Sequence, residues 1–166
     1  MIQARRLAAL LPLLCAFIPA RAASPLDLDA GLRAAIHDDN YKLGVGGELG
    51  AVSPATPVWD LGLHLNYTHF TSKVPEAIGD VDEWGGYVTA YFKPAIDQGF
   101  SLRLGPHVGY AKIGSSYLDV GGDVMAVFKA TPVLSFYGAF IPSWMVGSGG
   151  QALVRIGLGL EYNTGK

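Results

Sequence analysis

Cysteine is almost absent from the 166-residue sequence, and its one occurrence, Cys15, lies in an apolar run over residues 7–20. Two arginines precede this run, and a small-residue pattern, Ala-Arg-Ala, ends it. These features are typical of a secretory signal peptide over residues 1–22, with cleavage after Ala22. The expected mature domain, residues 23–166, then has no cysteine, which excludes disulfide bonds and thiolate sites from it.

Positive charge and long apolar runs are also scarce. The sequence has 12 Lys and Arg residues against 14 Asp and Glu residues, and three of the arginines belong to the signal segment. The remaining nine basic side chains leave the mature chain with a formal charge of −5, which argues against nucleic acid as a partner. After residue 22 no apolar run approaches the roughly 20 residues that a membrane-spanning helix needs. Half of all residues are nevertheless hydrophobic, so their apolar surface must be accommodated by a structure other than a membrane-spanning helix.

Hydrophobic residues instead alternate with polar or small ones. Over residues 152–162, for example, one face carries only Ala, Val, Ile, Leu and Tyr, and the other carries Arg155, Glu161 and two glycines. A period of two predicts a β-strand with one apolar face. The same pattern predicts seven further strands, over residues 26–37, 41–51, 59–68, 84–93, 100–110, 118–129 and 133–141.

Three observations indicate that the apolar face meets lipid rather than a second sheet. In six of the eight predicted strands this face carries no charge, as lipid would require, since an Arg or Lys at mid-bilayer costs about 2–4 kcal/mol. The polar face mixes glycine with charges of both signs, which suits a packed interior. Aromatic residues gather near strand ends, where they anchor at membrane interfaces: Tyr41, Trp59, Tyr67, Trp84, Phe92, Phe100, Tyr110, Phe128, Trp144 and Tyr162.

The predicted fold is all-β, a closed antiparallel eight-stranded up-and-down transmembrane β-barrel. The sheet must close because lipid offers no hydrogen-bond partners for the backbone groups of an open strand edge. An even strand number puts both termini on the periplasmic side, with the turns at 53–57, 94–99 and 130–132. The connections at 38–40, 72–83, 114–116 and 143–151 are then extracellular. A soluble periplasmic ligand-binding β-barrel is the alternative. We expect a monomer.

The segment from Arg155 to Tyr162 resembles the terminal-strand signal of bacterial outer-membrane proteins. A polar residue at Arg155, then Gly157, Leu160 and the aromatic Tyr162 match its pattern, although the chain continues to Lys166 instead of ending on the aromatic. This resemblance implies recognition by the barrel-assembly machinery.

The mature chain also resembles small eight-stranded barrels of the OmpA transmembrane-domain and OmpX type. In its glycine-rich strands, and in the stretch from residue 84 to 110, it is similar to YfaZ-type outer-membrane proteins. The resemblance implies export through the periplasm to the outer membrane of a Gram-negative-type cell, with outer-membrane lipid and lipopolysaccharide as surroundings.

Strand alternation directs eleven charged side chains into the barrel. The interior of an eight-stranded barrel is just wide enough for side chains to fill it, so we expect these charges to pair and plug the lumen. A narrow pore for small solutes is the alternative. The eleven residues are Asp27, Asp29, Arg33, Lys42, Glu48, Arg103, Asp119, Asp123, Lys129, Arg155 and Glu161.

The four histidines show no spacing typical of a metal site, and no metal or cofactor is expected. We interpret all four, His37, His64, His69 and His107, as hydrogen-bonded interior or rim residues. His69, close to Thr71 and Ser72, is the one local candidate for a nucleophile–base pair, with Glu76 or Asp80 as orienting carboxylate. This group supports the alternative hypothesis that the protein is a lipid-acting outer-membrane enzyme, of the lipid A deacylase or acyltransferase type. The main prediction is a non-enzymatic barrel with a structural, adhesive or minor small-solute role.

Overall fold

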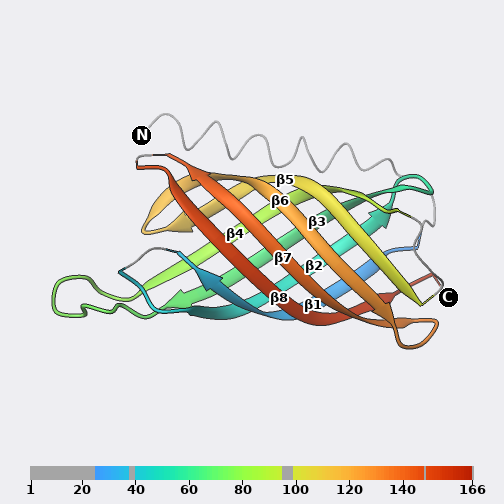
Figure 1. The fold of residues 1–166 in the computed structure, drawn as a ribbon, viewed down its shortest axis with the longest axis horizontal. Coiled ribbons are helices and arrows are strands. Elements are labelled where there is room, and N and C mark those ends of the chain that lie inside the picture. Colours follow the sequence, from blue (N-terminus) through green and yellow to red (C-terminus); the bar gives the residue numbers. More distant parts are fainter. Residues whose placement is uncertain (1–24, 38–39, 95–98, 148, 166) are drawn as a thin grey trace.

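The computed structural model describes residues 25–37, 40–94, 99–147 and 149–165, which form one closed barrel of eight antiparallel strands (Figure 1). Each strand pairs with the next, and β8 returns to pair with β1. The predicted fold class is therefore confirmed. The strands are β1 (Asp27–Ile36), β2 (Gly44–Pro54), β3 (Trp59–Phe70), β4 (Val81–Phe92), β5 (Phe100–Ile113), β6 (Ser115–Lys129), β7 (Leu134–Val146) and β8 (Gln151–Asn163).

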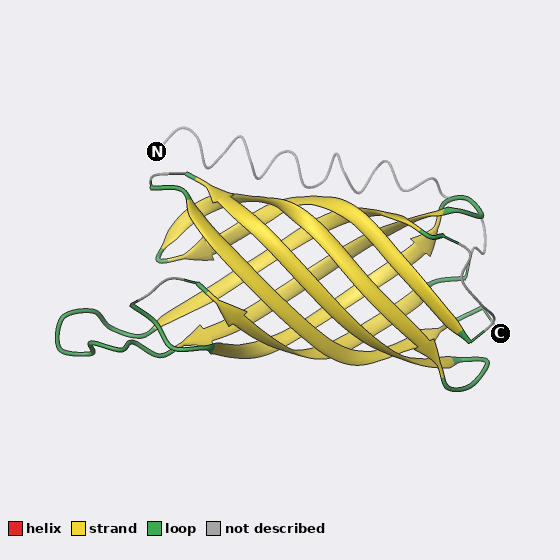
Figure 2. Cartoon of the chain, in the orientation of Figure 1, coloured by secondary structure: helices red, strands yellow, loops and turns green. Residues whose placement is uncertain are grey.

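The predicted signal segment, with Cys15 and the cleavage position, lies outside the described residues. In the part of the chain that is described, no helix is long and apolar enough to cross a membrane. Cartoon colouring shows the barrel as strands joined by short loops, with one longer loop at one end (Figure 2).

Side chains alternate across the barrel wall as their sequence predicts. Apolar residues on the outer face are widely exposed, as in Leu32 (76%) and Leu158 (68%), whereas Arg33 and Arg155 on the inner face are almost fully buried. The outer face is thus apolar, as expected of a barrel surrounded by lipid, and the inner face holds charged side chains together with buried apolar ones such as Met125 and Ile141. On β7, Phe136 and Phe140 are exposed on the outer face as expected.

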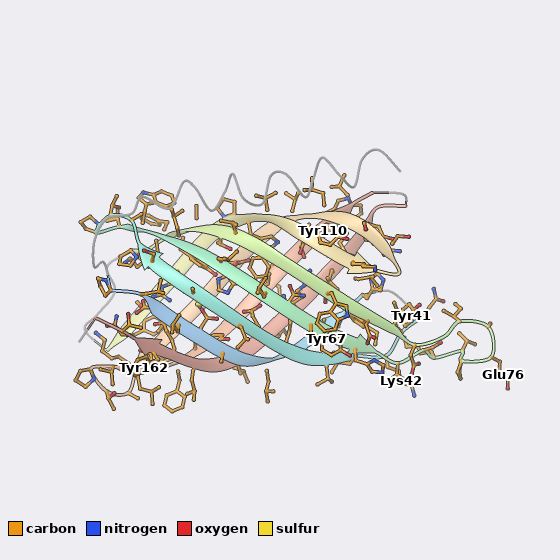
Figure 3. The ribbon with its side chains drawn as sticks, turned by 180° about the vertical axis from the view of Figure 1, so that it is seen from behind. Tyr41, Lys42, Tyr67, Glu76, Tyr110 and Tyr162 are labelled. Carbon is orange, nitrogen blue, oxygen red and sulfur yellow. The ribbon has the colours of Figure 1, made fainter. Side chains whose placement is uncertain are left out.

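Aromatic rings form pairs near both ends of the barrel. We call the end where β1 begins and β8 finishes the termini end, and the opposite end the loop end. Trp59 packs on Phe92 near the termini end, whereas Tyr67 packs on Trp84 toward the loop end, with ring centroids 5.5 and 4.5 Å apart. Tyr162 and Tyr67 mark the two ends in Figure 3. Rings at these levels suit the two membrane interfaces.

Strands β3 to β8 extend further toward the loop end than the sequence predicted, whereas β1 and β2 are shorter at that end. β4 begins at Val81 instead of residue 84, and the connection between β5 and β6 is Gly114 alone, at φ 63°. A single residue with positive φ makes so tight a turn possible, and glycine adopts it without a Cβ clash. β7 continues through Pro142, where the pairing with β6 skips from Ser143 to Phe140.

The connection between β3 and β4, residues 71–80, is the projecting loop. It extends beyond the rest of the barrel at the loop end, and Glu76 lies at its far end (Figure 3). The segment before β2 pairs with its base, since Lys42 N donates to Thr71 O at 2.9 Å and Lys73 N donates to Asn40 O at 2.8 Å. These bonds continue the sheet beyond the closed barrel.

Candidate functional site

The barrel lumen is the candidate site, because it gathers most of the charged side chains of the fold. Of the eleven residues expected there, eight are buried: Asp29, Arg33, Glu48, Arg103, Asp119, Asp123, Arg155 and Glu161. Asp27 is half-buried at the termini end, and Lys129 is exposed at the end of β6.

One expected lumenal residue, Lys42, does not lie in the lumen. It precedes β2 and its side chain is exposed, because β2 begins at Gly44 and not at residue 41. The backbone of Lys42 instead pairs with the base of the projecting loop. Three lumenal charges were left out of the prediction: Asp60, Glu83 and Lys93.

At the termini end, Arg103 collects three carboxylates. It donates to Asp27 at 2.9 Å, lies 3.3 Å from Asp60, and forms an ion pair with Glu161. Lys93 follows the end of β4, and its Nζ lies 2.6 Å from Oδ1 of Asp60. A cavity of about 240 Å³ opens beside this group, lined among others by Asp27, Lys93, Arg103 and Glu161. This end of the lumen is a polar vestibule.

The middle of the lumen holds a hydrogen-bonded group centred on Glu48 and His64. Arg33 lies 3.2 Å from Glu48, and the Tyr87 hydroxyl donates to the same carboxylate oxygen at 2.8 Å. The His64 ring stacks on Tyr87, with centroids 4.9 Å apart and planes 17° apart. Tyr91 links His64 to Asp123 at 3.1 and 3.0 Å.

Further toward the loop end, His107 lies between two carboxylates. Its Nδ1 is 2.6 Å from Asp123 and its Nε2 is 3.4 Å from Asp119. Both ring nitrogens thus face carboxylate oxygens, and the contact with Asp123 is the shorter one. Arg155 then joins Asp119 and Glu83, each at 2.6 Å.

A layer of apolar side chains closes the lumen at the loop end. Phe70, Met145, Leu153 and Ala111 have no exposed surface, and Ala35, Ile113 and Tyr117 complete the cluster. Strand ends of β1, β3, β5 and β7 and strand starts of β6 and β8 supply it. We call it the apolar plug.

The described lumen carries more acid than base. Its carboxylates are Asp27, Asp29, Glu48, Asp60, Glu83, Asp119, Asp123 and Glu161. Its guanidinium and ammonium groups are Arg33, Lys93, Arg103 and Arg155. Buried charge of one sign is costly unless it is paired, so protons or cations must offset part of this excess.

Asp29, Glu48 and His64 are the described residues that come together as candidate metal ligands, with one ligand atom from each within 4.8 Å of the others. The sequence did not suggest them as a set because they lie on three different strands. Local spacing along one strand carries no sign of such a cluster.

The structure separates His69 from Ser72, one of the two nucleophiles considered with it, but places it near Asp80, one of the two candidate orienting carboxylates. Its Nδ1 lies 2.8 Å from Asp82, and its exposed ring faces Asp80 at 3.7 Å. Ser72 is on the opposite face of the sheet, buried, and its hydroxyl accepts from the Val74 backbone. Histidine and serine thus point to different sides of the barrel wall.

No protein-family model and no curated protein matches the chain, but solved structures do. Ail, the attachment invasion locus protein of Yersinia pestis, matches with a TM-score of 0.58 at 19% identity, covering 86% of this chain and 99% of Ail. OprG from Pseudomonas aeruginosa matches with a TM-score of 0.65 at 10% identity, covering 87% and 97%. The N-terminal β-barrel domain of OprF from the same organism gives 0.51 at 12%, covering 84% and 98%.

The fold is that of a small outer-membrane β-barrel. The expected similarity to small eight-stranded barrels is confirmed at the level of the fold. In a small outer-membrane β-barrel the apolar exterior faces lipid, and closure pairs the backbone groups that an open sheet edge would expose.

Proposed function

We propose that the chain is a non-enzymatic outer-membrane protein whose barrel is closed to solutes and whose loop end has a structural or adhesive role at the cell surface. The observation that carries this proposal is the sealed lumen: ion pairs cross it along its length, and the apolar plug closes one end. A water-filled channel needs polar surface open to water, whereas most of the charged side chains of this interior pair across the lumen.

The orientation follows from the loops. Barrels of this class keep short turns and both termini in the periplasm and longer loops outside, which would put the projecting loop on the cell exterior. β5 and β6 have 14 and 15 residues, more than the 9–11 that cross a bilayer, so the sheet would rise above the membrane at this end.

Outer-membrane lipid and lipopolysaccharide would surround the apolar wall, and the β8 signal would serve recognition by the barrel-assembly machinery. In β8, Leu160 and Tyr162 project outward and Arg155 projects inward. An outward aromatic near the strand end is accessible to a partner before the barrel closes. The finer similarity to YfaZ-type proteins stays a prediction.

Conductance in a planar lipid bilayer tests the proposal. The refolded protein should insert without producing single-channel steps in molar potassium chloride. Steps of reproducible size would contradict a sealed lumen and favour the alternative solute-handling role, for which the polar vestibule would be the entrance. An unrelated open barrel of similar preparation serves as the positive control for insertion.

A further inference from the structure

Asp29, Gly50 and His64 form one row across three neighbouring strands. Asp29 on β1 is the register partner of Gly50 on β2, and Gly50 is the partner of His64 on β3. A Cβ on Gly50 would collide with both carboxylate oxygens of Asp29 and with Nδ1 of His64. The two side chains therefore converge on the same point, above the glycine.

Glu48, two residues before Gly50, completes the group. His64 Nδ1 is 3.6 Å from Asp29 Oδ1 and 3.7 Å from Glu48 Oε1. These separations are too long for good hydrogen bonds, which span about 2.7–3.2 Å. They are close to the distance of about 3.3–3.4 Å between two ligand atoms that each lie about 2.0–2.1 Å from a tetrahedral zinc ion.

The other polar atoms of Glu48 and His64 are already engaged. Glu48 uses Oε2 for Arg33 and Tyr87, which leaves Oε1 toward His64. Tyr91 donates its hydroxyl proton to Asp123, so its oxygen accepts from Nε2–H of His64. In this tautomer Nδ1 presents a lone pair. Neither oxygen of Asp29 has a hydrogen-bond partner among the described residues.

Three buried groups thus point electron pairs at one position. Asp29 and His64 have no exposed side-chain surface, and Glu48 has 4%. A neutral imidazole facing two carboxylates is repulsive, so the arrangement requires either a proton shared within this group or a cation between the ligands. Tyr91 supplies the outer partner that usually fixes the tautomer of a metal-bound histidine.

We propose that Asp29, Glu48 and His64 bind one divalent transition-metal ion of the zinc class inside the lumen. One imidazole with two carboxylates suits such an ion better than calcium or magnesium, which prefer oxygen ligands alone. The ion would link β1, β2 and β3 and offset part of the acidic excess of the lumen. This inference does not depend on the proposed surface role.

Zinc binding to the refolded full-length barrel tests the site. After treatment with a chelator and buffer exchange, the wild-type protein should bind about one zinc ion per chain by elemental analysis. The affinity, measured by competition with a chromogenic chelator, should fall at least tenfold in His64→Ala and in Asp29→Asn. Cobalt(II) should show a visible absorption band in the wild-type protein that both variants lose.

His107→Gln is the matched control. His107 is also buried between two carboxylates, but its Nδ1 lies at hydrogen-bond distance, 2.6 Å, from Asp123, and its Nε2 lies 3.4 Å from Asp119. This variant should keep one zinc ion at wild-type affinity. Heat-dependent gel mobility reports folding of each variant, and Asp29→Asn, nearly isosteric with the natural residue, serves if His64→Ala does not fold.

Two results would overturn the proposal. One is a folded wild-type protein that binds no zinc, together with nitrogen chemical shifts that show His64 protonated on both ring nitrogens at pH 7. The other is zinc bound equally by the wild-type protein and the folded Asp29→Asn variant, which would locate the ion elsewhere.

Discussion

At the scale of single residues, barrel stability depends on charges that meet across the lumen. Arg155 and Glu83 are fully buried, and 72 residues of sequence separate them. Arg155 also donates to Ser143 at 2.7 Å and pairs with Asp119. Removing one member of such a group leaves the others charged in a medium that solvates them poorly.

Arg155→Met keeps an unbranched apolar side chain of similar length but leaves Glu83 and Asp119 without their cation. We expect a loss of about 3–5 kcal/mol in the free energy of unfolding, the cost typical of breaking a buried ion pair. Urea-induced unfolding in lipid vesicles measures it. Adding Glu83→Gln to the variant should recover part of the loss.

Lys129→Met is the matched control, because Lys129 is exposed at the end of β6. Its free energy of unfolding should stay within about 0.5 kcal/mol of the wild type. A loss below about 1 kcal/mol for Arg155→Met would contradict the view that the buried charges depend on one another.

The direction of a side chain could be predicted from sequence, but its partner could not. Strand alternation directed Arg103 and Glu161 to the inside, and the structure buries both. Their pairing depends on which strands face each other across the lumen, which no local pattern contains. Asp60 lies on the polar face of its predicted strand and could have been included in the predicted charge network, whereas Glu83 falls in a predicted loop, where alternation gives it no direction.

At the scale of elements, each strand combines a lipid face with a lumen face. In β8, Leu158 lies on the outer face and is one of its most exposed apolar side chains. We expect Leu158→Arg to destabilise the barrel by about 2–4 kcal/mol in vesicles, because the charge would enter the hydrocarbon layer. Equilibrium unfolding from vesicles measures the difference.

Val74→Arg provides the comparison, since Val74 is an exposed apolar residue in the projecting loop and outside the strands. Its effect on the free energy of unfolding should be within about 0.5 kcal/mol. Equal costs at the two positions would mean that the wall of β8 does not face lipid.

We expect the projecting loop to contribute to adhesion but not to the stability of the barrel. Replacing residues 74–78 with a glycine–serine linker leaves Ser72, Asp80 and the strands in place. We expect the barrel to refold and to keep its heat-dependent mobility, whereas adhesion of expressing cells to a coated surface should fall several-fold. Unchanged adhesion would remove the support for a role of this loop.

β4 shows why one strand was hard to interpret from sequence. Its inner face carries Tyr87 and Tyr91, two large rings that pack with buried apolar residues of β6 and β7 such as Met125 and Ile141. Both rings fill lumen space and use their hydroxyls on Glu48 and Asp123, so they are polar at the tip and apolar in the body. Hydrophobic periodicity alone cannot assign such a residue to a face.

At the scale of the whole molecule, the number of strands and the closure of the sheet were predictable, but the strand ends were not. The alternation over each strand predicts a sheet, and the uncharged apolar face favours a closed barrel in lipid over a soluble β-sandwich. The connections predicted at 114–116 and 143–151 are shorter in the structure, because Gly114 alone joins β5 to β6 and β7 continues to Val146. Pairing with a neighbour, which a sequence pattern does not show, decides how far each strand continues.

The central claim is that this chain forms a closed barrel in the outer membrane. Fractionation of cells that express the full chain, followed by electrophoresis of boiled and unboiled samples, tests it most directly. A closed barrel has no free edge and should resist detergent until it is heated. The account predicts an outer-membrane band whose mobility changes on boiling. A soluble periplasmic protein with one mobility would contradict it.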